Sequence, residues 1–154
     1  MRHSFDIKSM KALLLTVGVL LSLVGFAGAQ EKEKALDHKS HRVVFELTGE
    51  SPEQWEALLN NVENVKKSLG KGTQIEVVAH GKGLGALLKT NAKLSDRMEK
   101  ISQDQVTFAA CENTMKRKNI SKEELLPFVK TVDSGVAEVV RKQETGWSYV
   151  KSGS

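Results

Sequence analysis

The sequence predicts an α/β domain in which five short strands form an open, mostly parallel sheet with helices on both faces. Three observations lead to this fold class. Strand-like runs alternate with helix-like runs between residues 42 and 152. Most of the strand-like runs are apolar throughout, which is typical of strands covered on both faces. Right-handed crossovers between parallel strands then give three layers, α/β/α.

The first 41 residues lie outside this alternation. Residues 1–29 combine a basic start, the apolar run ALLLTVGVLLSLVGFAG and a small-x-small ending, which predict a cleaved signal peptide. The alternative is an uncleaved membrane anchor, because the apolar run approaches the roughly 18 residues of a membrane span. Cleavage predicts a periplasmic or otherwise exported protein with no remaining membrane segment. Residues 30–41, QEKEKALDHKSH, are polar and predict a flexible tether.

Composition excludes some classes of partner. The formal net charge of the chain is +4, and residues 1–29 carry three basic side chains against one acidic, which leaves the domain near +2. With aromatic residues at only 5%, we expect no nucleic-acid surface. The single cysteine, Cys111, cannot form an intramolecular disulfide. Its thiol is therefore buried and inert, paired between chains, or reactive.

Two strands and one long helix are predicted in the first half of the domain. The runs RVVFELT (42–48) and TQIEVVA (73–79) are rich in β-branched residues and predict strands. Between them, Ser51 can cap a helix, Pro52 fits its first position and Gln54 completes a capping box. Apolar side chains then recur at helical spacing: Trp55, Leu58, Leu59, Val62, Val65 and Leu69.

The second half continues the alternation. A Gly-rich turn and a short helix follow the second strand, and Ser95 is a possible cap for the next helix. QVTFAA (105–110) predicts a third strand that ends directly on Cys111. Ser121 and Glu124 form a capping box that opens the helix-like run SKEELLP. The last predicted elements are a strand over 127–132, a helix lined by Val136, Val139 and Val140, and a strand over 147–151.

Candidate chemistry gathers where the predicted strands end. Ligands of open parallel sheets bind beyond the carboxyl ends of the strands, which here precede residues 48–51, 80–85 and 111–115. His80 and Cys111 share one rim if the second and third strands are neighbours. The N–H groups of a helix start, together with the basic residues at 116–118, favour a thiolate at Cys111. The alternative is an inert cysteine, because FAAC is also typical of a buried strand.

The stretch GKGLGA (81–86) formally fits the dinucleotide fingerprint G-x-G-x-x-A. It follows the second strand of the domain rather than the first, its helix is short, and an exported protein rarely meets NAD. We therefore expect no cofactor and interpret the glycines as a tight turn that allows close helix–strand packing. An anion cradle of backbone amides is the alternative. No metal site is expected either, although His38 and His41 lie in the polar tether.

Four segments together resemble the DsrE/DsrF-like family, and more narrowly its exported, single-domain members. They are VVFELTGESPEQWEALLNNVENV, IEVVAHGKGLGALL, FAACENTMKRKNI and VDSGVAEVVRKQETGWSYVK, and they cover about residues 42–152. The resemblance implies a three-layer domain with a five-stranded parallel sheet, and homo-oligomers that are trimers or hexamers. In the family's cytoplasmic sulfur-relay members, a cysteine after this strand carries persulfide sulfur, a role that maps onto Cys111.

The resemblance also implies which residues surround the thiol. AHGKG matches the loop beside the family's site, so we expect His80, Gly81 and Gly83, with Glu112 and Asn113, to bind the ligand. The function expected is a sulfurtransferase-like persulfide carrier that exchanges sulfur with a donor or acceptor protein. The alternatives are a non-enzymatic, oligomeric module that binds a small ligand or anion, with a structural cysteine, and a disulfide between two chains.

Overall fold

The structure, a computed structural model, describes residues 40–152. Within these residues the predicted α/β fold is confirmed: five strands, each parallel to its neighbours, form one sheet in the order β4-β3-β2-β1-β5. The strands are β1 (Arg42–Leu47), β2 (Gln74–Ala79), β3 (Val106–Cys111), β4 (Lys130–Val132) and β5 (Ser148–Ser152). The helices are α2 (Pro52–Leu69), α3 (Ala92–Ser102), α4 (Glu112–Lys118) and α5 (Gly135–Glu144), with 3₁₀ turns η1 (Gly83–Leu87) and η2 (Lys122–Glu124).

The predictions for the N-terminal part of the chain fall mostly outside the described residues. The signal peptide predicted over residues 1–29 lies there, as does the tether predicted over 30–41 apart from its last two positions. The second of these, His41, already belongs to the domain, because its carbonyl accepts a hydrogen bond of 2.9 Å from Gln74 N. No helix within residues 40–152 is long and apolar enough to cross a membrane.

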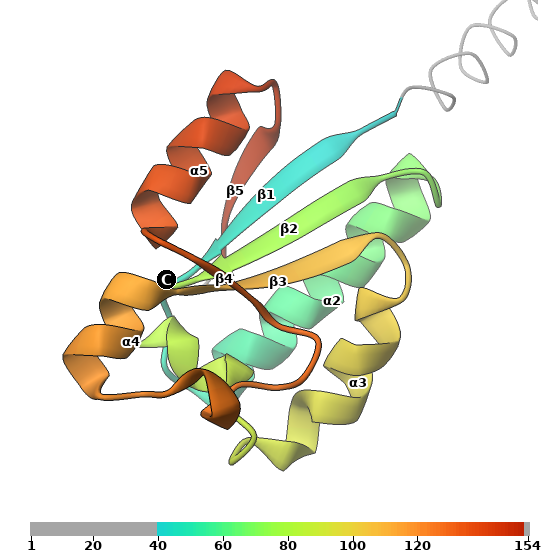
Figure 1. Cartoon of the computed structure of the whole chain (residues 1–154). Coiled ribbons are helices and arrows are strands. Elements are labelled where there is room, and N and C mark those ends of the chain that lie inside the picture. Colours follow the sequence, from blue (N-terminus) through green and yellow to red (C-terminus); the bar gives the residue numbers. More distant parts are fainter. Residues whose placement is uncertain (1–39, 153–154) are drawn as a thin grey trace, which may run out of the picture. The chain divides into compact units, whose positions relative to one another are not determined.

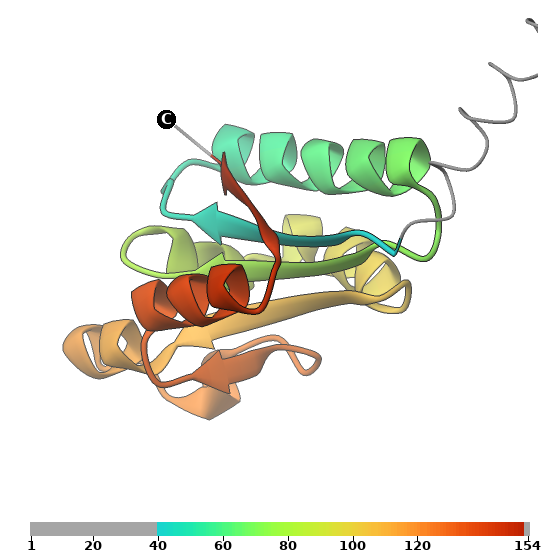
Figure 2. The same cartoon turned by 90° about the horizontal axis from the view of Figure 1, so that it is seen from above.

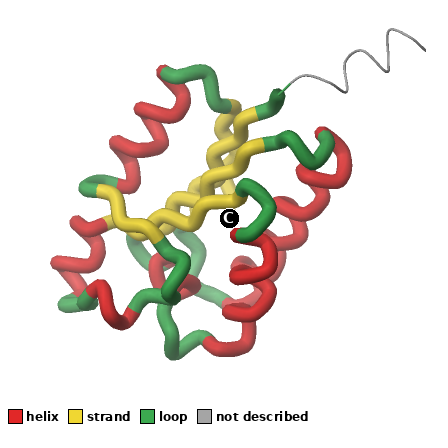
Figure 3. Tube along the Cα trace, turned by 45° about the vertical axis from the view of Figure 1, so that its right-hand side comes forward, coloured by secondary structure: helices red, strands yellow, loops and turns green. Residues whose placement is uncertain are grey.

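The chain crosses the sheet in one direction and then returns. β1, β2, β3 and β4 are laid down side by side, and the connection through α5 carries the chain back to the other edge, where β5 pairs with β1 (Figures 1 and 2). α2 and α3 cover one face of the sheet and α5 the other, so that helices flank the strands on both sides (Figure 3). This arrangement brings the start of α5 over the carboxyl ends of the central strands.

The two faces of the sheet carry cores of unequal depth. Alternate strand residues such as Phe45 and Phe108 face α2, α3 and η1 and form the larger core. The other face contributes a small cluster of Val44, Val78 and Ala109 that packs against Val139 of α5. Of the valines predicted to line this helix, only Val139 is buried; Val136 and Val140 are 57% and 46% exposed. The α5 face is therefore thinly covered.

The capping signals of α2 are confirmed. The Ser51 hydroxyl accepts a hydrogen bond from Gln54 N, and the Gln54 side chain accepts one from Ser51 N, which closes the capping box. Pro52 occupies the first helical position, where its missing N–H leaves no carbonyl unpaired. Gly70 ends the helix with a positive φ of 91°. Local sequence therefore determined both ends of this helix.

Two local predictions are wrong. α3 begins at Ala92, so Ser95 lies inside the helix rather than at its cap, because the preceding turn is needed to bury Leu94. The helix-like run after Ser121 forms only the single turn η2, although the predicted capping box is present. Its backbone is instead hydrogen-bonded to the end of η1 and the residues after it. Lys89 N donates to Glu124 O and Leu126 N donates to Leu87 O, each at 2.9 Å.

Candidate functional site at the carboxyl ends of the central strands

β2 and β3 are neighbours, which brings His80 and Cys111 to one rim of the sheet. Ala79 pairs with Ala110, so the residue after β2 lies beside the last residue of β3. Gly135, the first residue of α5, packs over both. A methyl group on Gly135 would lie 2.9 Å from His80 Cβ and 3.2 Å from Cys111 Cβ. The rim is therefore closed by the N-terminal end of α5.

The sulfur of Cys111 is surrounded by hydrogen-bond donors. The Thr114 hydroxyl and the backbone N–H groups of Gly135, Thr114 and Asn113 lie around it, and Asn113 N also donates a hydrogen bond of 3.3 Å to Asp133 O. Burial raises the pKa of the thiol, but these donors outweigh burial and bring the pKa below its ordinary value. The cysteine is only 5% exposed. The site thus favours a thiolate that is largely shielded from solvent.

Thr114 connects the thiol to the glycine loop after β2. Its side-chain oxygen accepts a hydrogen bond of 3.0 Å from Gly81 N, and its hydroxyl is one of the groups that lower the pKa of the thiol. Gly81 has a φ of +58°, in the left-handed region that glycine adopts readily. Thr114 itself is buried, with 1% of its surface exposed. Thr114 therefore joins the glycine loop to the start of α4 beside the thiol.

Beside the thiol, three side chains form a hydrogen-bonded chain: Glu46 of β1, His80 directly after β2, and Tyr149 of β5. His80 Nε2 lies 2.8 Å from Glu46 Oε1, and the hydroxyl of Tyr149 donates to the other carboxylate oxygen of Glu46. Burial raises the pKa of the Glu46 carboxyl, but the hydrogen bonds from Tyr149 and His80 hold it below its usual range. The same contact raises the pKa of Tyr149 to about 12. Glu46 is therefore an ionised anchor for His80.

The glycines of the loop serve close packing. A methyl group on Gly83 would lie 2.3 Å from Leu47 O, so only glycine allows η1 to approach the end of β1 this closely. The fingerprint-like stretch opens a 3₁₀ turn, not an α-helix. The loop amides are already engaged: Gly83 N donates to His80 O at 3.1 Å and Gly85 N to Lys82 O at 3.2 Å. They are not aimed outward as an anion cradle requires.

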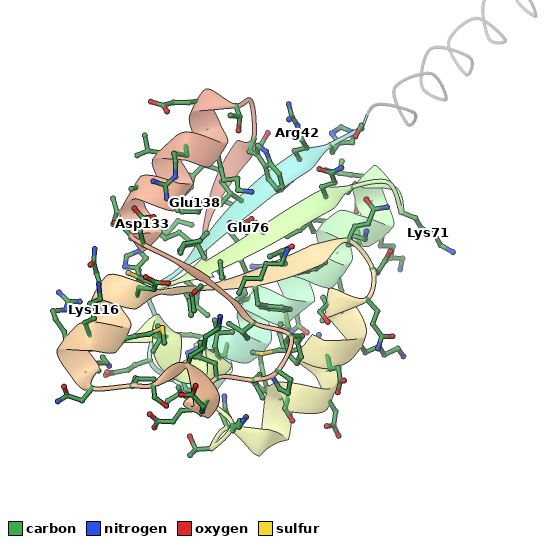
Figure 4. All side chains as sticks on the ribbon, in the orientation of Figure 1. Arg42, Lys71, Glu76, Lys116, Asp133 and Glu138 are labelled. Carbon is green, nitrogen blue, oxygen red and sulfur yellow. The ribbon has the colours of Figure 1, made fainter. Side chains whose placement is uncertain are left out.

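The other two predicted ligand residues begin α4. Asn113 contributes its backbone N–H, which lies near the sulfur and 3.3 Å from Asp133 O. Asp133 precedes α5 and lies between that helix and α4 (Figure 4). Glu112 is half-buried and lines a separate cavity of about 330 Å³ with Lys116, on the other side of α4. The basic residues at 116–118 occupy the last turn of α4 and do not contribute to the lowered thiol pKa.

Four residues of the site were not singled out from the sequence: Glu46, Thr114, Gly135 and Tyr149. Glu46 did carry a signal, because it is a carboxylate inside the otherwise apolar run RVVFEL. Thr114 was part of the quoted cysteine motif but had no role assigned. Nothing in the local sequence marks Gly135 or Tyr149. They reach the site only because the chain runs back from β4 through α5 to β5, beside β1. Within residues 40–152, no cluster of three His, Cys, Asp or Glu side chains can hold a metal ion.

Comparison with known proteins supports the fold and its family. A family model described as the DsrE/DsrF-like family matches residues 42–152. A protein of unknown function from Methanobacterium thermoautotrophicum, MTH1491, has 32% identity and a TM-score of 0.69, covering 73% of this chain and 99% of its own. The ychN protein of E. coli has 11% identity and a TM-score of 0.59, covering 73% of this chain and 99% of its own. BT1422 of Bacteroides thetaiotaomicron has 11% identity and a TM-score of 0.57, covering 71% of this chain and 93% of its own. No curated protein matches the chain.

Proposed function

This chain belongs to the DsrE/DsrF-like family, and we propose that it is a persulfide carrier that holds sulfane sulfur on Cys111. The observation that carries the proposal is the set of donors around the sulfur, one hydroxyl and three backbone N–H groups. Donors fixed in this way stabilise an anionic sulfur, whether the thiolate or the terminal sulfur of a persulfide.

The transfer step follows from thiolate chemistry. The Cys111 thiolate attacks the outer sulfur of a donor R–S–SH, which forms a new S–S bond and breaks the donor's own S–S bond. The electron pair of the broken bond leaves on R–S⁻, which is protonated to R–SH. The product is Cys111–S–SH, and the thiolate of an acceptor can remove its outer sulfur by the same reaction. No net oxidation occurs, because sulfane sulfur is only moved.

A mass measurement tests the proposal. The purified protein is incubated with polysulfide or thiosulfate under anoxic conditions, and the intact mass is then determined. We expect wild type to gain the mass of one sulfur atom and Cys111→Ser to gain none. Thr114→Val, which keeps the shape of the side chain but removes the hydroxyl, is expected to react more slowly. An unmodified wild type, or an equal adduct on Cys111→Ser, would contradict a carrier function.

Burial of the thiol favours a second candidate, a non-enzymatic binding module in which Cys111 is structural. Only 5% of this residue is exposed, and the start of α5 covers it. Labelling with a small thiol reagent separates the two functions. Under the carrier proposal the native thiol reacts readily at neutral pH; under the second candidate it reacts slowly until the protein is unfolded.

Assembly and export complete the proposal. Val136 and Val140 lie one turn apart on α5 and are exposed, as is Tyr149 of β5 at 41%, and such exposed apolar side chains support a homo-oligomer, a trimer or hexamer. Light scattering on the purified protein tests this, and a monomer at all concentrations would rule it out. The intact mass of the protein recovered from the periplasm tests whether residues 1–29 are removed during export. A sulfur donor or acceptor protein is the expected partner.

A further inference from the structure

The sulfur-transfer step leaves one requirement that the donors around Cys111 do not meet. The thiol that departs from the sulfur donor leaves as an anion and must be protonated. The hydroxyl of Thr114 and the backbone N–H groups at the sulfur stabilise charge but do not give up protons at neutral pH. A titratable group beside the sulfur is needed, and histidine is the side chain whose ordinary pKa fits.

His80 lies in the required place. Its Cβ and Cδ2 pack at 2.9 Å and 3.1 Å from the position of a Gly135 methyl group, the same position that lies 3.2 Å from Cys111 Cβ. The side chain is 18% exposed, so the imidazole is accessible from the solvent side of the rim. Within residues 40–152, the only hydrogen bond of the imidazole is made by Nε2. Nδ1 is therefore left for a substrate.

The orientation of His80 is fixed from behind. Glu46 Oε1 lies 2.8 Å from Nε2, and Tyr149 holds the second oxygen of the same carboxylate. The Glu46 side chain is 18% exposed, so its pairing with His80 is poorly screened by water. A carboxylate at Nε2 orients the imidazole and leaves Nδ1 pointing away from Glu46. The Tyr149 hydroxyl thus binds the Glu46 carboxylate, which in turn binds the His80 imidazole.

Resting on the proposed carrier function, we propose that His80 protonates the thiol that leaves the sulfur donor, and that Glu46 and Tyr149 are its positioning residues. In the step, the His80 imidazolium gives its Nδ1 proton to R–S⁻ as the S–S bond of the donor breaks, and the neutral imidazole then regains a proton from water. Products and charges balance: thiolate, R–S–SH and imidazolium give Cys111–S–SH, R–SH and imidazole.

The charged groups around His80 are few, and each is accounted for. β1 contributes Glu46, β3 contributes Cys111, and β5 contributes Tyr149 and Lys151, whose charge acts on Glu46. On and before α5, Asp133 and Glu138 both bind Arg141, and Glu138 also lies 3.7 Å from Lys142, so each of these carboxylates has a basic partner. On the loop after His80, Lys82 is paired with Glu50 at 2.8 Å. Glu46 is therefore the carboxylate that controls the imidazole.

Two sulfur donors that give the same product test this assignment. An alkyl hydropersulfide leaves as a basic thiolate that needs a proton, whereas benzenethiosulfonate leaves as a stable sulfinate anion that needs none. Formation of the Cys111 persulfide from each donor is followed by intact mass against time and pH. The variants are His80→Asn, which keeps the Cβ that packs on Gly135, Glu46→Gln and Tyr149→Phe. Glu50→Gln is the matched control, since it removes an exposed carboxylate from the same rim.

We expect His80→Asn and Glu46→Gln to slow transfer from the alkyl hydropersulfide about 100-fold, the low end of general acid catalysis. Transfer from benzenethiosulfonate should change less than about threefold, because its leaving group needs no proton. The pH profiles of wild type and His80→Asn with the alkyl donor should differ in shape, because only wild type has a titratable side chain at this position. Tyr149→Phe should show a smaller defect of the same kind, and Glu50→Gln none.

The outcomes separate this inference from the carrier function. If wild type forms no persulfide with either donor, both fail. If wild type forms the persulfide but the variants slow both donors equally, or neither, the proton-donor role is wrong and the carrier function stands. Urea unfolding of each variant accompanies the kinetics, because a loss of folding would slow both donors alike.

Discussion

Replacing Gly135 by alanine should weaken both the fold and the thiolate site. The added methyl group would lie 2.9 Å from His80 Cβ, 3.1 Å from His80 Cδ2 and 3.2 Å from Cys111 Cβ. Carbon atoms in ordinary contact are about 3.5–4.0 Å apart. Both Cβ atoms are attached directly to the backbone at the ends of β2 and β3 and cannot rotate away. The start of α5 must therefore withdraw from the sheet.

The magnitude follows from two opposing effects. Overpacking of a tight site costs about 1–3 kcal/mol. Alanine is favoured over glycine within a helix by roughly 0.5–1 kcal/mol, which offsets part of this cost. We expect Gly135→Ala to lower the free energy of unfolding by about 1–2 kcal/mol. Withdrawal of α5 also moves Gly135 N away from the sulfur, so the pKa of the Cys111 thiol should rise.

Urea unfolding and thiol alkylation measure the two effects on the same samples. The unfolding curves give the change in free energy, provided the slope with denaturant is unchanged. The rate of alkylation by iodoacetamide against pH gives the midpoint for thiolate formation, which should move to higher pH. Gly72→Ala is the control, because its methyl group would meet nothing within 4 Å and it should stabilise the protein by about 0.4–1 kcal/mol. A Gly135→Ala protein with unchanged stability and an unchanged alkylation midpoint would refute the tight seating of α5.

Two further predictions concern Glu76 of the sheet and the glycines of η1. Glu76 is 7% exposed and lies 2.7 Å from Lys142 Nζ, yet burial raises the pKa of its carboxyl above the ordinary value of 4.5. Its protonated form is therefore favoured on folding, and the stability this gives is complete below pH 4.5 and is lost as the pH rises through the raised pKa. Glu76→Gln, which resembles the protonated form, should be at least as stable as wild type at neutral pH, and the difference should vanish in acid; a clear loss of stability at pH 7 would contradict this. Gly83→Ala places a methyl group 2.3 Å from Leu47 O and should cost about 1–3 kcal/mol or more by urea unfolding. Gly85→Ala, whose methyl group would lie 3.4 Å from the Trp55 ring, should be nearly neutral, and equal losses for the two variants would show that the backbone contact is not the cause.

The fold class was predictable because its signals are local. Capping residues and apolar periodicity determined α2, and the apolar runs indicated strands buried on both faces. The prediction failed where distant backbone replaced local preference. The run after Ser121 carries a capping box, but Leu126 N and Glu124 O are bound to the segment after η1, so the helix stops after one turn.

The candidate site was predictable only on one side. His80 directly follows β2 and Cys111 ends β3, and these two strands are neighbours. Both residues lie in short sequence motifs. The groups that complete the site come from far along the chain: Tyr149 contacts Glu46 across 103 residues of sequence. Such pairings depend on the order of the strands, which no local pattern specifies. The same holds for Gly135, where any side chain would collide with His80 and Cys111.

The return of the chain from β4 to β5 also governs the order in which the site can form. Cys111, Thr114 and Gly81 meet once β1, β2 and β3 have paired, and they need nothing beyond α4. The covering N–H of Gly135 and the hydroxyl of Tyr149 arrive only with the segment after β4. Contacts of such long sequence separation form late in folding. A nascent chain therefore carries an uncovered thiol until its last helix docks, which makes this cysteine most vulnerable to oxidation before folding ends.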